Sequence, residues 1–180
     1  DTFTGIIDVV EMSTRYYDSD VLGSTYRVEN GIPSGYEEIV SEHREKLFEA
    51  LSDFDEEIMT RFLEGDHNNI EPLKIKRAVR KAVIKTALFP VFCGSSFKNK
   101  GVQLLLDAVI DYLPSPLDLP PIKVEGLKKD KEKFVAPTDD IPGALIFKIM
   151  SDPFVGELSL VRVYCGELKV GHQYYNPLSD

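Results

Sequence analysis

A proline-rich stretch near the middle of the chain limits how it can fold more than any other feature. Residues 114–121 read Pro-Ser-Pro-Leu-Asp-Leu-Pro-Pro. Proline is excluded from helix interiors and restricts the residue before it to extended backbone. We therefore expect a stiff linker here, with a helix-rich part before it and a β-rich part after it.

The part before the linker predicts β-structure first and then helices. Residues 3–17 are rich in β-branched and aromatic side chains and predict one or two strands, and residues 26–28 add a short extended piece. Apolar residues recur with a helical period over residues 36–51, and a second helix begins after Asp53 or Asp55 and stops at Gly65. Together these two segments predict a helical hairpin.

A third helix is expected over residues 71–88. Its predicted inner stripe consists of Ile75, Val79, Ala82, Val83 and Thr86. Its other side carries six cations, which are Lys74, Lys76, Arg77, Arg80, Lys81 and Lys85. This side is either a solvated face beside acidic helices or a surface that binds RNA or an acidic protein.

The segment 89–113 predicts half of an α/β unit. A short apolar strand at Phe89–Cys93 is followed by the polar turn GSSFKNKGVQ at 94–103 and by a helix over 102–113. The side chains expected to face inward from this helix are Leu105, Leu106, Val109, Ile110 and Leu113. Strand-to-helix turns often bind ligands through free backbone N–H groups. The alternative is a turn without a ligand, in which Ser96 or Asn99 caps the helix and Lys98 and Lys100 are solvated.

Beyond the linker, the pattern becomes all-β. Strands are expected at 145–150, 156–164 and 173–176, and the charged run 128–133 is expected to form an exposed loop or hairpin tip. These strands predict a small barrel that begins within the chain and does not close.

Composition excludes several classes of protein. With 43% hydrophobic residues in 180, the chain can bury a core, and a net charge of -9 argues against a surface that wraps nucleic acid. Cys93 and Cys165 lie in apolar surroundings without metal-ligand spacing, so we expect two buried, reduced thiols and no metal site. The chain shows no signal segment and no bilayer-spanning run, which favours a cytoplasmic protein without a membrane partner. The sequence enters directly into a β-like run, as expected of a piece of a longer protein.

Four stretches carry a resemblance in both order and spacing. They are FTGIIDVVEM at 3–12, EALSDFDEEIMTRFLEG at 49–65, PVFCGSSFKNKGVQLLLDAVIDYLPSPLDLPPI at 90–122, and FKIMSDPFVGELSLVRVYCGELKVG at 147–171. In combination they resemble the bacterial elongation factor G family, the GTPases that drive ribosomal translocation of tRNA and mRNA. The resemblance covers essentially the full chain.

The resemblance implies an α/β plus β architecture. Residues 1–88 would be the inserted α+β subdomain of the GTPase domain, and residues 89–113 would be the C-terminal strand and helix of its P-loop GTPase fold. Residues 114–140 would be a linker and loop, and residues 141–180 would begin the second domain, a translation-factor β-barrel.

The resemblance also implies a role for the polar turn, which is similar to the fifth GTPase motif. Ser95, Ser96 and Phe97 would line the nucleotide base site, with backbone N–H groups donating to the guanine carbonyl oxygen. Adenine carries an amino group at that position, so a fixed donor favours guanine. The family usually has alanine where this chain has Ser96. A backbone contact survives that change, although the hydroxyl could compete for a local hydrogen bond.

The parts that would make a catalyst are missing from this sequence. GTP hydrolysis needs a phosphate cradle, magnesium ligands and a group that orients water. The 180 residues contain no G-x-x-x-x-G-K-[ST] and no N-K-x-D, and D-x-x-G occurs only in turn-like connectors at 20–23 and 140–143. GTP and magnesium are therefore expected for a full-length parent, while this chain is expected to hold no cofactor, no catalytic residue and no GTPase activity.

The resemblance suggests the ribosome, and the ribosomal stalk protein in particular, as partners. In the family the inserted subdomain faces the stalk, and the candidate contacts here are Glu56, Glu57 and Glu64, with Thr60 beside them. The alternative is a solvated acidic face beside the cationic third helix. A further alternative for the parent is a paralogous GTPase that acts in ribosome recycling or ribosome protection.

Overall fold

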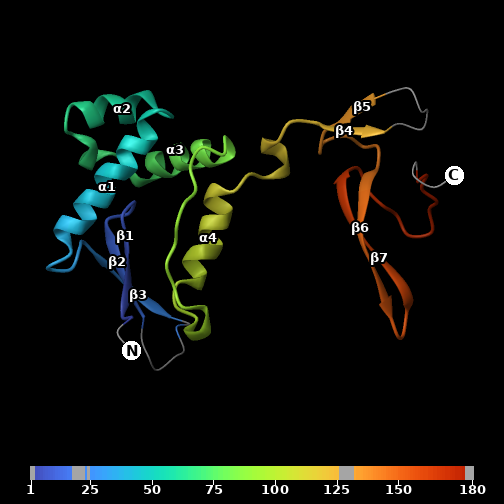
Figure 1. Cartoon of the computed structure of the whole chain (residues 1–180), viewed down its shortest axis with the longest axis horizontal. Coiled ribbons are helices and arrows are strands. Elements are labelled where there is room, and N and C mark those ends of the chain that lie inside the picture. The colour runs from blue at the N-terminus through green and yellow to red at the C-terminus, as the bar shows by residue number, and fades with distance from the viewer. Residues whose placement is uncertain (1–2, 18–22, 24, 126–131, 177–180) are drawn as a thin grey trace. The chain divides into compact units, whose positions relative to one another are not determined.

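The computed structural model describes residues 3–17, 23, 25–125 and 132–176. The chain divides into two compact units, Asp1–Leu113 and Pro114–Asp180 (Figure 1). The described residues form a mixed α/β structure of four α-helices and three small antiparallel sheets. None of these helices is long and apolar enough to cross a membrane. The elements of the first unit are β1 (Gly5–Asp8), β2 (Ser13–Tyr17), β3 (Tyr26–Asn30), α1 (Glu37–Ser52), α2 (Glu56–Leu63), α3 (Pro72–Ile84) and α4 (Val102–Tyr112).

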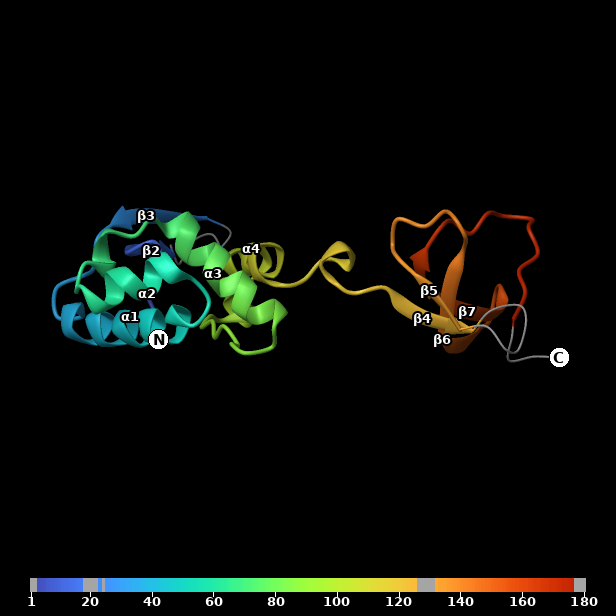
Figure 2. The same ribbon diagram turned by 90° about the horizontal axis from the view of Figure 1, so that it is seen from above.

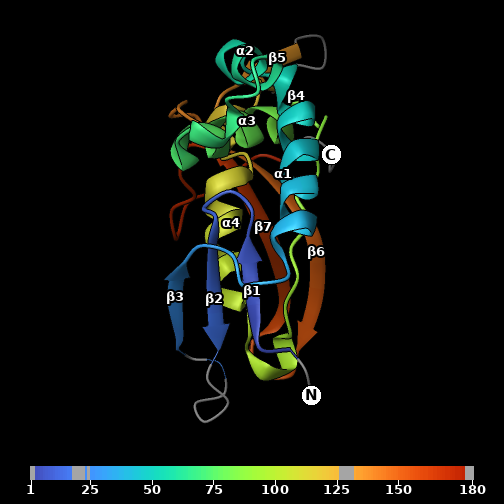
Figure 3. The same cartoon turned by 90° about the vertical axis from the view of Figure 1, so that its left-hand side faces the viewer.

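The first unit begins with the three-stranded sheet β1-β2-β3. The strands are antiparallel, with Arg15 opposite both Ile6 of β1 and Val28 of β3. The turn between β1 and β2 is closed by Asp8, whose carboxylate accepts hydrogen bonds from the backbone N–H groups of Val10 and Glu11 at 2.9 Å. The predicted strands within residues 3–17 and at 26–28 are confirmed. Figures 1 and 3 show α4 on one side of this sheet.

The predicted helical hairpin is also confirmed, as α1 followed by α2 (Figure 2). The cap of α2 is Asp55, whose carboxylate accepts hydrogen bonds from the N–H groups of Glu57 and Ile58 at 3.1 Å. This contact satisfies two of the donors that a helix start leaves unpaired. Gly65 follows the helix with a φ of 75°, a conformation that glycine adopts without strain.

Helix α3 ends earlier than the sequence predicted. Its last turn is closed by hydrogen bonds from the Thr86 N–H to the Val83 carbonyl at 2.8 Å and from the Ala87 N–H to the Ala82 carbonyl at 3.0 Å. This pair of bonds defines a Schellman ending, in which Thr86 takes a left-handed φ of 56°. The prediction of Thr86 as an inward residue is therefore wrong, because it lies beyond the helix and is exposed.

The core of the first unit lies among the four helices. The largest fully buried side chains are Phe48, Leu51, Ile58 and Ile75. Helix α4 contributes Ala108 and Tyr112 to the same cluster, and α3 packs against both α1 and α4. Burying a side chain of this size contributes roughly 1.5–3 kcal/mol. The stability of the first unit therefore comes chiefly from the packing of its helices.

The predicted strand at residues 89–93 is not formed. This segment makes no backbone hydrogen bond with any described residue, and the side chains of Phe89 and Val91 are 78% and 93% exposed. Phe92 stacks on Tyr112 with ring centroids 6.2 Å apart. An apolar strand needs neighbours on both sides, and the described residues supply none. Cys93 is exposed for the same reason, so its predicted burial is wrong.

The predicted inner face of α4 is exposed as well. Five side chains were expected to face inward, and all five are exposed, namely Leu105, Leu106, Val109, Ile110 and Leu113. The buried residues of this helix are instead Ala108 and Tyr112. The apolar stripe exists, but nothing among the described residues covers it.

The second unit consists of two antiparallel hairpins. Its described strands are β4 (Ile122–Glu125), β5 (Glu132–Val135), β6 (Gly143–Asp152) and β7 (Gly156–Cys165). Val135 and Cys165 are buried, as predicted for Cys165, and a side chain at Gly143 would lie 2.7 Å from the Cys165 sulfur. The hairpins do not close into a barrel.

Two features of the second unit differ from the expectations, and a third expectation falls mostly on residues that are not described. The β4–β5 hairpin was not predicted, and the strand expected at 173–176 is absent from this described stretch. The charged run 128–133 lies mostly outside the described residues, and its last two residues begin β5. Strands β6 and β7 confirm the two longer predicted strands.

Candidate nucleotide-contact turn

The polar turn before α4 has a defined backbone geometry. Ser95 and Lys100 exchange two backbone hydrogen bonds, from Ser95 N–H to Lys100 O at 2.8 Å and from Lys100 N–H to Ser95 O at 2.9 Å. Inside this bridge, residues Ser96–Lys98 form one turn of 3-10 helix, and Asn99 is left-handed with a φ of 54°. Gly101 then starts α4 with a φ of 81°.

This geometry leaves two backbone donors of the turn without a partner among the described residues. The N–H groups of Ser96 and Phe97 have no hydrogen-bond partner among the residues that the structure describes. Phe97 is 99% exposed and Ser96 is exposed, whereas Ser95 is half-buried. The turn can therefore offer two fixed donors and one aromatic face to a planar polar ligand.

The simple capping alternative does not fit this turn. The N-cap of α4 is Gly101, and no side chain caps that helix start. Neither Ser96 nor Asn99 therefore caps α4. Lys100 is not simply solvated either, because its ammonium group donates a hydrogen bond to the Phe3 carbonyl at 2.7 Å.

The described residues do not supply a metal site. They include no group of three His, Cys, Asp or Glu side chains that could hold a metal ion. The free groups of the turn are N–H donors, which suit an oxygen acceptor and not a cation. The donor set can therefore meet a carbonyl oxygen or a phosphate oxygen of a ligand, and it does not fit magnesium.

The three acidic candidates on α2 differ in their surroundings. Glu57 forms ion pairs with Lys74 at 2.6 Å and Arg61 at 3.3 Å. The hydrogen bond from Lys74 lowers the pKa of Glu57 below its ordinary value. Glu56 and Glu64 are exposed and form no ion pair with any described residue. Only these two carboxylates are available to a partner without breaking a contact within the chain.

The cations of α3 mostly make contacts within the first unit. Lys74 pairs with Asp55 as well as Glu57, and Lys76 pairs with Glu11 at 2.7 Å. Arg80 donates hydrogen bonds to the carbonyls of Asp111 and Leu113 at 3.1 and 2.8 Å, at the negative end of the α4 dipole.

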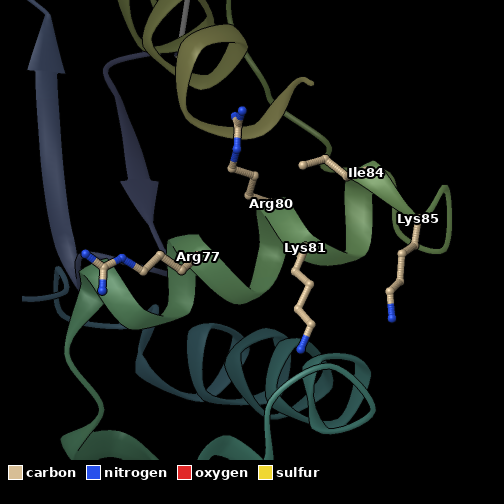
Figure 4. Close-up of a pocket in the computed structure, with 5 residues that line it drawn as sticks. All are labelled: Arg77, Arg80, Lys81, Ile84 and Lys85. Carbon is tan, nitrogen blue, oxygen red and sulfur yellow. The ribbon is translucent and has the colours of Figure 1, made fainter. Parts of the chain in front are cut away.

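Four cations of α3 and Ile84 line a shallow depression of about 270 Å³, and the cations are Arg77, Arg80, Lys81 and Lys85. Figure 4 shows Arg80 pointing toward α4 and Lys81 pointing to the opposite side. Lys81 donates a hydrogen bond to the Phe54 carbonyl at 2.7 Å, and Lys85 lies over the Phe54 ring. These side chains diverge, so the face does not form a convergent anion site.

Comparison with solved structures identifies a protein with a similar fold. No protein-family model matches the chain. The chain is similar to the crystal structure of a protein from Thermus thermophilus, with a TM-score of 0.66 and 27% identity over 94% of this chain. The match spans 22% of that protein's length. The likeness supports a shared arrangement of elements over nearly the whole chain, and the activity of a whole protein of this kind remains a proposal.

Sequence reasoning missed how the turn is supported. The residues responsible are Lys100 and Gln103, which contact the N-terminal part of the chain. Both lie in the KNKGVQ stretch, but they resemble ordinary polar turn and helix residues. Their partners are 97 and 80 residues away in the sequence, so local pattern carried no signal for these contacts.

Proposed function

We propose that this chain is part of a translational GTPase similar to elongation factor G and that its turn at 95–97 contacts guanine. The observation that carries this proposal is the pair of free N–H groups of Ser96 and Phe97 at an exposed turn before α4. The resemblance places the base-contact motif at the same residues. A translocase and a paralogue acting in ribosome recycling or ribosome protection would use such a turn in the same way.

The chemistry of the turn suits guanine better than adenine. Guanine presents a carbonyl oxygen where adenine presents an amino group, so a fixed N–H donor gains a hydrogen bond with the first and meets another donor in the second. Because the donors belong to the backbone, the serine at position 96 does not remove them. The exposed Phe97 ring provides an apolar surface beside them.

The turn does not make the chain a GTPase. Most of the affinity for a nucleotide comes from the phosphates and the metal, and neither a phosphate loop nor a metal-binding group is found among the described residues. The proposed parent would hold GTP and magnesium with other parts of its sequence. Within this chain, the residues do no more than position donors at the base.

We therefore expect this chain to bind guanine weakly and selectively. Isothermal titration with GDP and magnesium should show no binding tighter than about 1 mM. NMR titration with millimolar GMP should shift the amide signals of Ser96 and Phe97, since those N–H groups meet the carbonyl oxygen. AMP at the same concentration should leave both signals in place.

Two outcomes would contradict this account. A dissociation constant for GDP in the micromolar range or tighter would mean that the chain contains a phosphate site. Equal shifts with GMP and AMP, or none with either, would mean that the turn does not distinguish guanine. The amide of Val91, which is exposed but outside the turn, serves as the internal control.

A second candidate function is contact with the ribosomal stalk protein through α2. It is favoured by the exposed carboxylates of Glu56 and Glu64, which are unpaired among the described residues. A basic partner domain would gain complementary charge there, which chiefly speeds encounter and is screened by salt.

Charge reversal tests this second candidate. We expect Glu56→Lys combined with Glu64→Lys to weaken binding to the stalk protein several-fold at low salt, with a smaller difference at high salt. Glu49→Lys, on the exposed part of α1, is the matched control and should bind as tightly as the unsubstituted chain does. Surface plasmon resonance at two salt concentrations gives the measurement. Unchanged binding of the double variant would remove α2 as the contact.

A further inference from the structure

The turn at 95–101 is tied to the N-terminal part of the chain by two long-range hydrogen bonds. The Lys100 ammonium donates to the Phe3 carbonyl at 2.7 Å and lies 5.7 Å from the centre of the Phe3 ring. The Gln103 side-chain N–H donates to the Gly23 carbonyl at 3.1 Å. Phe3 lies just before β1, so the contacts fasten the turn to the side of the small sheet.

Gly23 adds a third contact, made by the backbone alone. Its φ is 66°, and a Cβ atom there would lie 2.5 Å from the Lys98 carbonyl oxygen and 2.8 Å from that of Asn99. Both distances are far below van der Waals contact, and the atoms they reach belong to the backbone of the turn. Only glycine allows this approach.

These contacts add to the support that the turn receives from α4, which follows it directly and packs into the core. The Ser95–Lys100 bridge closes the turn on itself but does not orient it relative to the rest of the unit. Residues 89–93 before it make no backbone hydrogen bond with described residues, and Phe92 contacts the unit by stacking on Tyr112. The contacts at Lys100, Gln103 and Gly23 are the ones that join the turn to the segments on either side of the sheet's first two strands, and they help to orient the Ser96 and Phe97 donors.

We propose that Lys100 and Gln103 are positioning residues for the guanine-contact turn. We propose also that Gly23 lets the backbone pack closely against the Lys98 and Asn99 carbonyls of that turn. The identity of the ligand as guanine rests on the proposed function, whereas the positioning of the turn rests on the contacts within the chain. Donors held in one orientation lose less entropy when they bind than donors that sample many. The segments that flank strands β1 and β2 thus support the proposed base site through Phe3 and Gly23.

Hydrogen exchange in the 180-residue chain tests the positioning role. Lys100→Met and Gln103→Leu should each accelerate exchange of the Ser95, Lys98 and Lys100 amides about five- to tenfold, as expected for the loss of one hydrogen bond. The amides of Val79 and Ala82 in α3 should exchange as before. Lys100→Arg keeps a donor within reach of Phe3 and should restore most of the protection.

Two glycines distinguish the effect of close backbone packing at Gly23 from the effect of backbone strain at any positive φ. Gly23 and Gly31 both have positive φ, at 66° and 100°, but a Cβ atom at Gly31 would meet nothing within 4 Å. We expect Gly23→Ala to accelerate exchange in the turn and Gly31→Ala to leave the turn unchanged. If Gly23→Ala unfolds the unit, the comparison of Lys100→Met and Gln103→Leu with Lys100→Arg decides the question.

The same samples distinguish a failure of positioning from a failure of the proposed function. Parent-like exchange in both Lys100→Met and Gln103→Leu overturns the positioning role, whatever the ligand. Faster exchange together with GMP shifts that shrink several-fold in the variants supports both proposals. Faster exchange in the variants, together with no GMP shift in the unsubstituted 180-residue chain, supports the positioning role and excludes guanine as the ligand.

Discussion

Replacing Arg44 with alanine should lower the free energy of unfolding of the first unit by about 3 kcal/mol. Arg44 lies on α1 and is only 3% exposed, although arginine is usually a surface residue. One guanidinium nitrogen donates to the Val9 and Val10 carbonyls in the β1–β2 turn, and another donates to the Asn68 side-chain oxygen at 3.3 Å. The alanine variant leaves these acceptors without a donor and opens a cavity beside Phe48.

Burial lowers the pKa of Arg44, although nearby Asp8 opposes this shift. An arginine nevertheless stays charged at any pH at which the protein folds. Its contacts therefore join a cation to carbonyl dipoles, and Arg44→Lys should recover only part of the stability because an ammonium group lacks the planar fork. Arg27→Ala removes an exposed arginine that forms one surface ion pair and lies over the Tyr16 ring, and it should lower stability by no more than about 1 kcal/mol.

Urea unfolding monitored by circular dichroism gives these differences. A loss below about 1 kcal/mol in Arg44→Ala would show that water replaces the guanidinium without penalty. The sheet and the helical hairpin would then be joined by packing alone. The expected larger loss would identify Arg44 as the polar connection between them.

The helical parts of the fold could be predicted because their signals are local. The period of apolar residues in 36–51 and the cap at Asp55 act within a few residues, and both are confirmed. The predicted end of α3 was wrong because Thr86 ends the helix in a left-handed conformation. Glycine or asparagine usually occupies such a position, so a β-branched residue there does not predict a helix end.

Predictions that depend on distant neighbours failed. The apolar run Phe89–Cys93 and the stripe on α4 have the composition of buried elements, yet both are exposed. Composition reports what a segment would bury and not whether a partner is present to bury it. The β4–β5 hairpin was missed for a related reason, since its strands have four residues each and lie next to the prolines and the charged run.

The candidate site divides in the same way. The positions Ser95, Ser96 and Phe97 could be proposed from a motif of consecutive residues, and the backbone of Ser96 and Phe97 now provides two free donors. The contacts that orient those donors join residues 80 and 97 positions apart, which no local pattern encodes. The side chains Lys100 and Gln103 therefore acquired a role only from the structure.

Cys93 should react with Ellman's reagent on the order of 100-fold faster than Cys165. Both are free thiols, but Cys93 is exposed and Cys165 is 3% exposed in the second unit. A buried thiol reacts only when its surroundings open, whereas an exposed thiol reacts at the rate set by its thiolate fraction. The single variants Cys93→Ser and Cys165→Ser assign the fast and slow phases at mildly alkaline pH.

The reactivity of Cys93 also tests the proposed place of residues 89–113 in a larger nucleotide-binding domain. If Phe89–Cys93 is a strand of a parallel sheet, a longer protein that includes the phosphate-binding loop should pair that segment and cover the apolar stripe of α4. Cys93 should then become protected to about the level of Cys165. An equally reactive Cys93 in the longer protein would mean that this segment is not a sheet strand, and the turn that follows it would lose its proposed position at the edge of such a sheet.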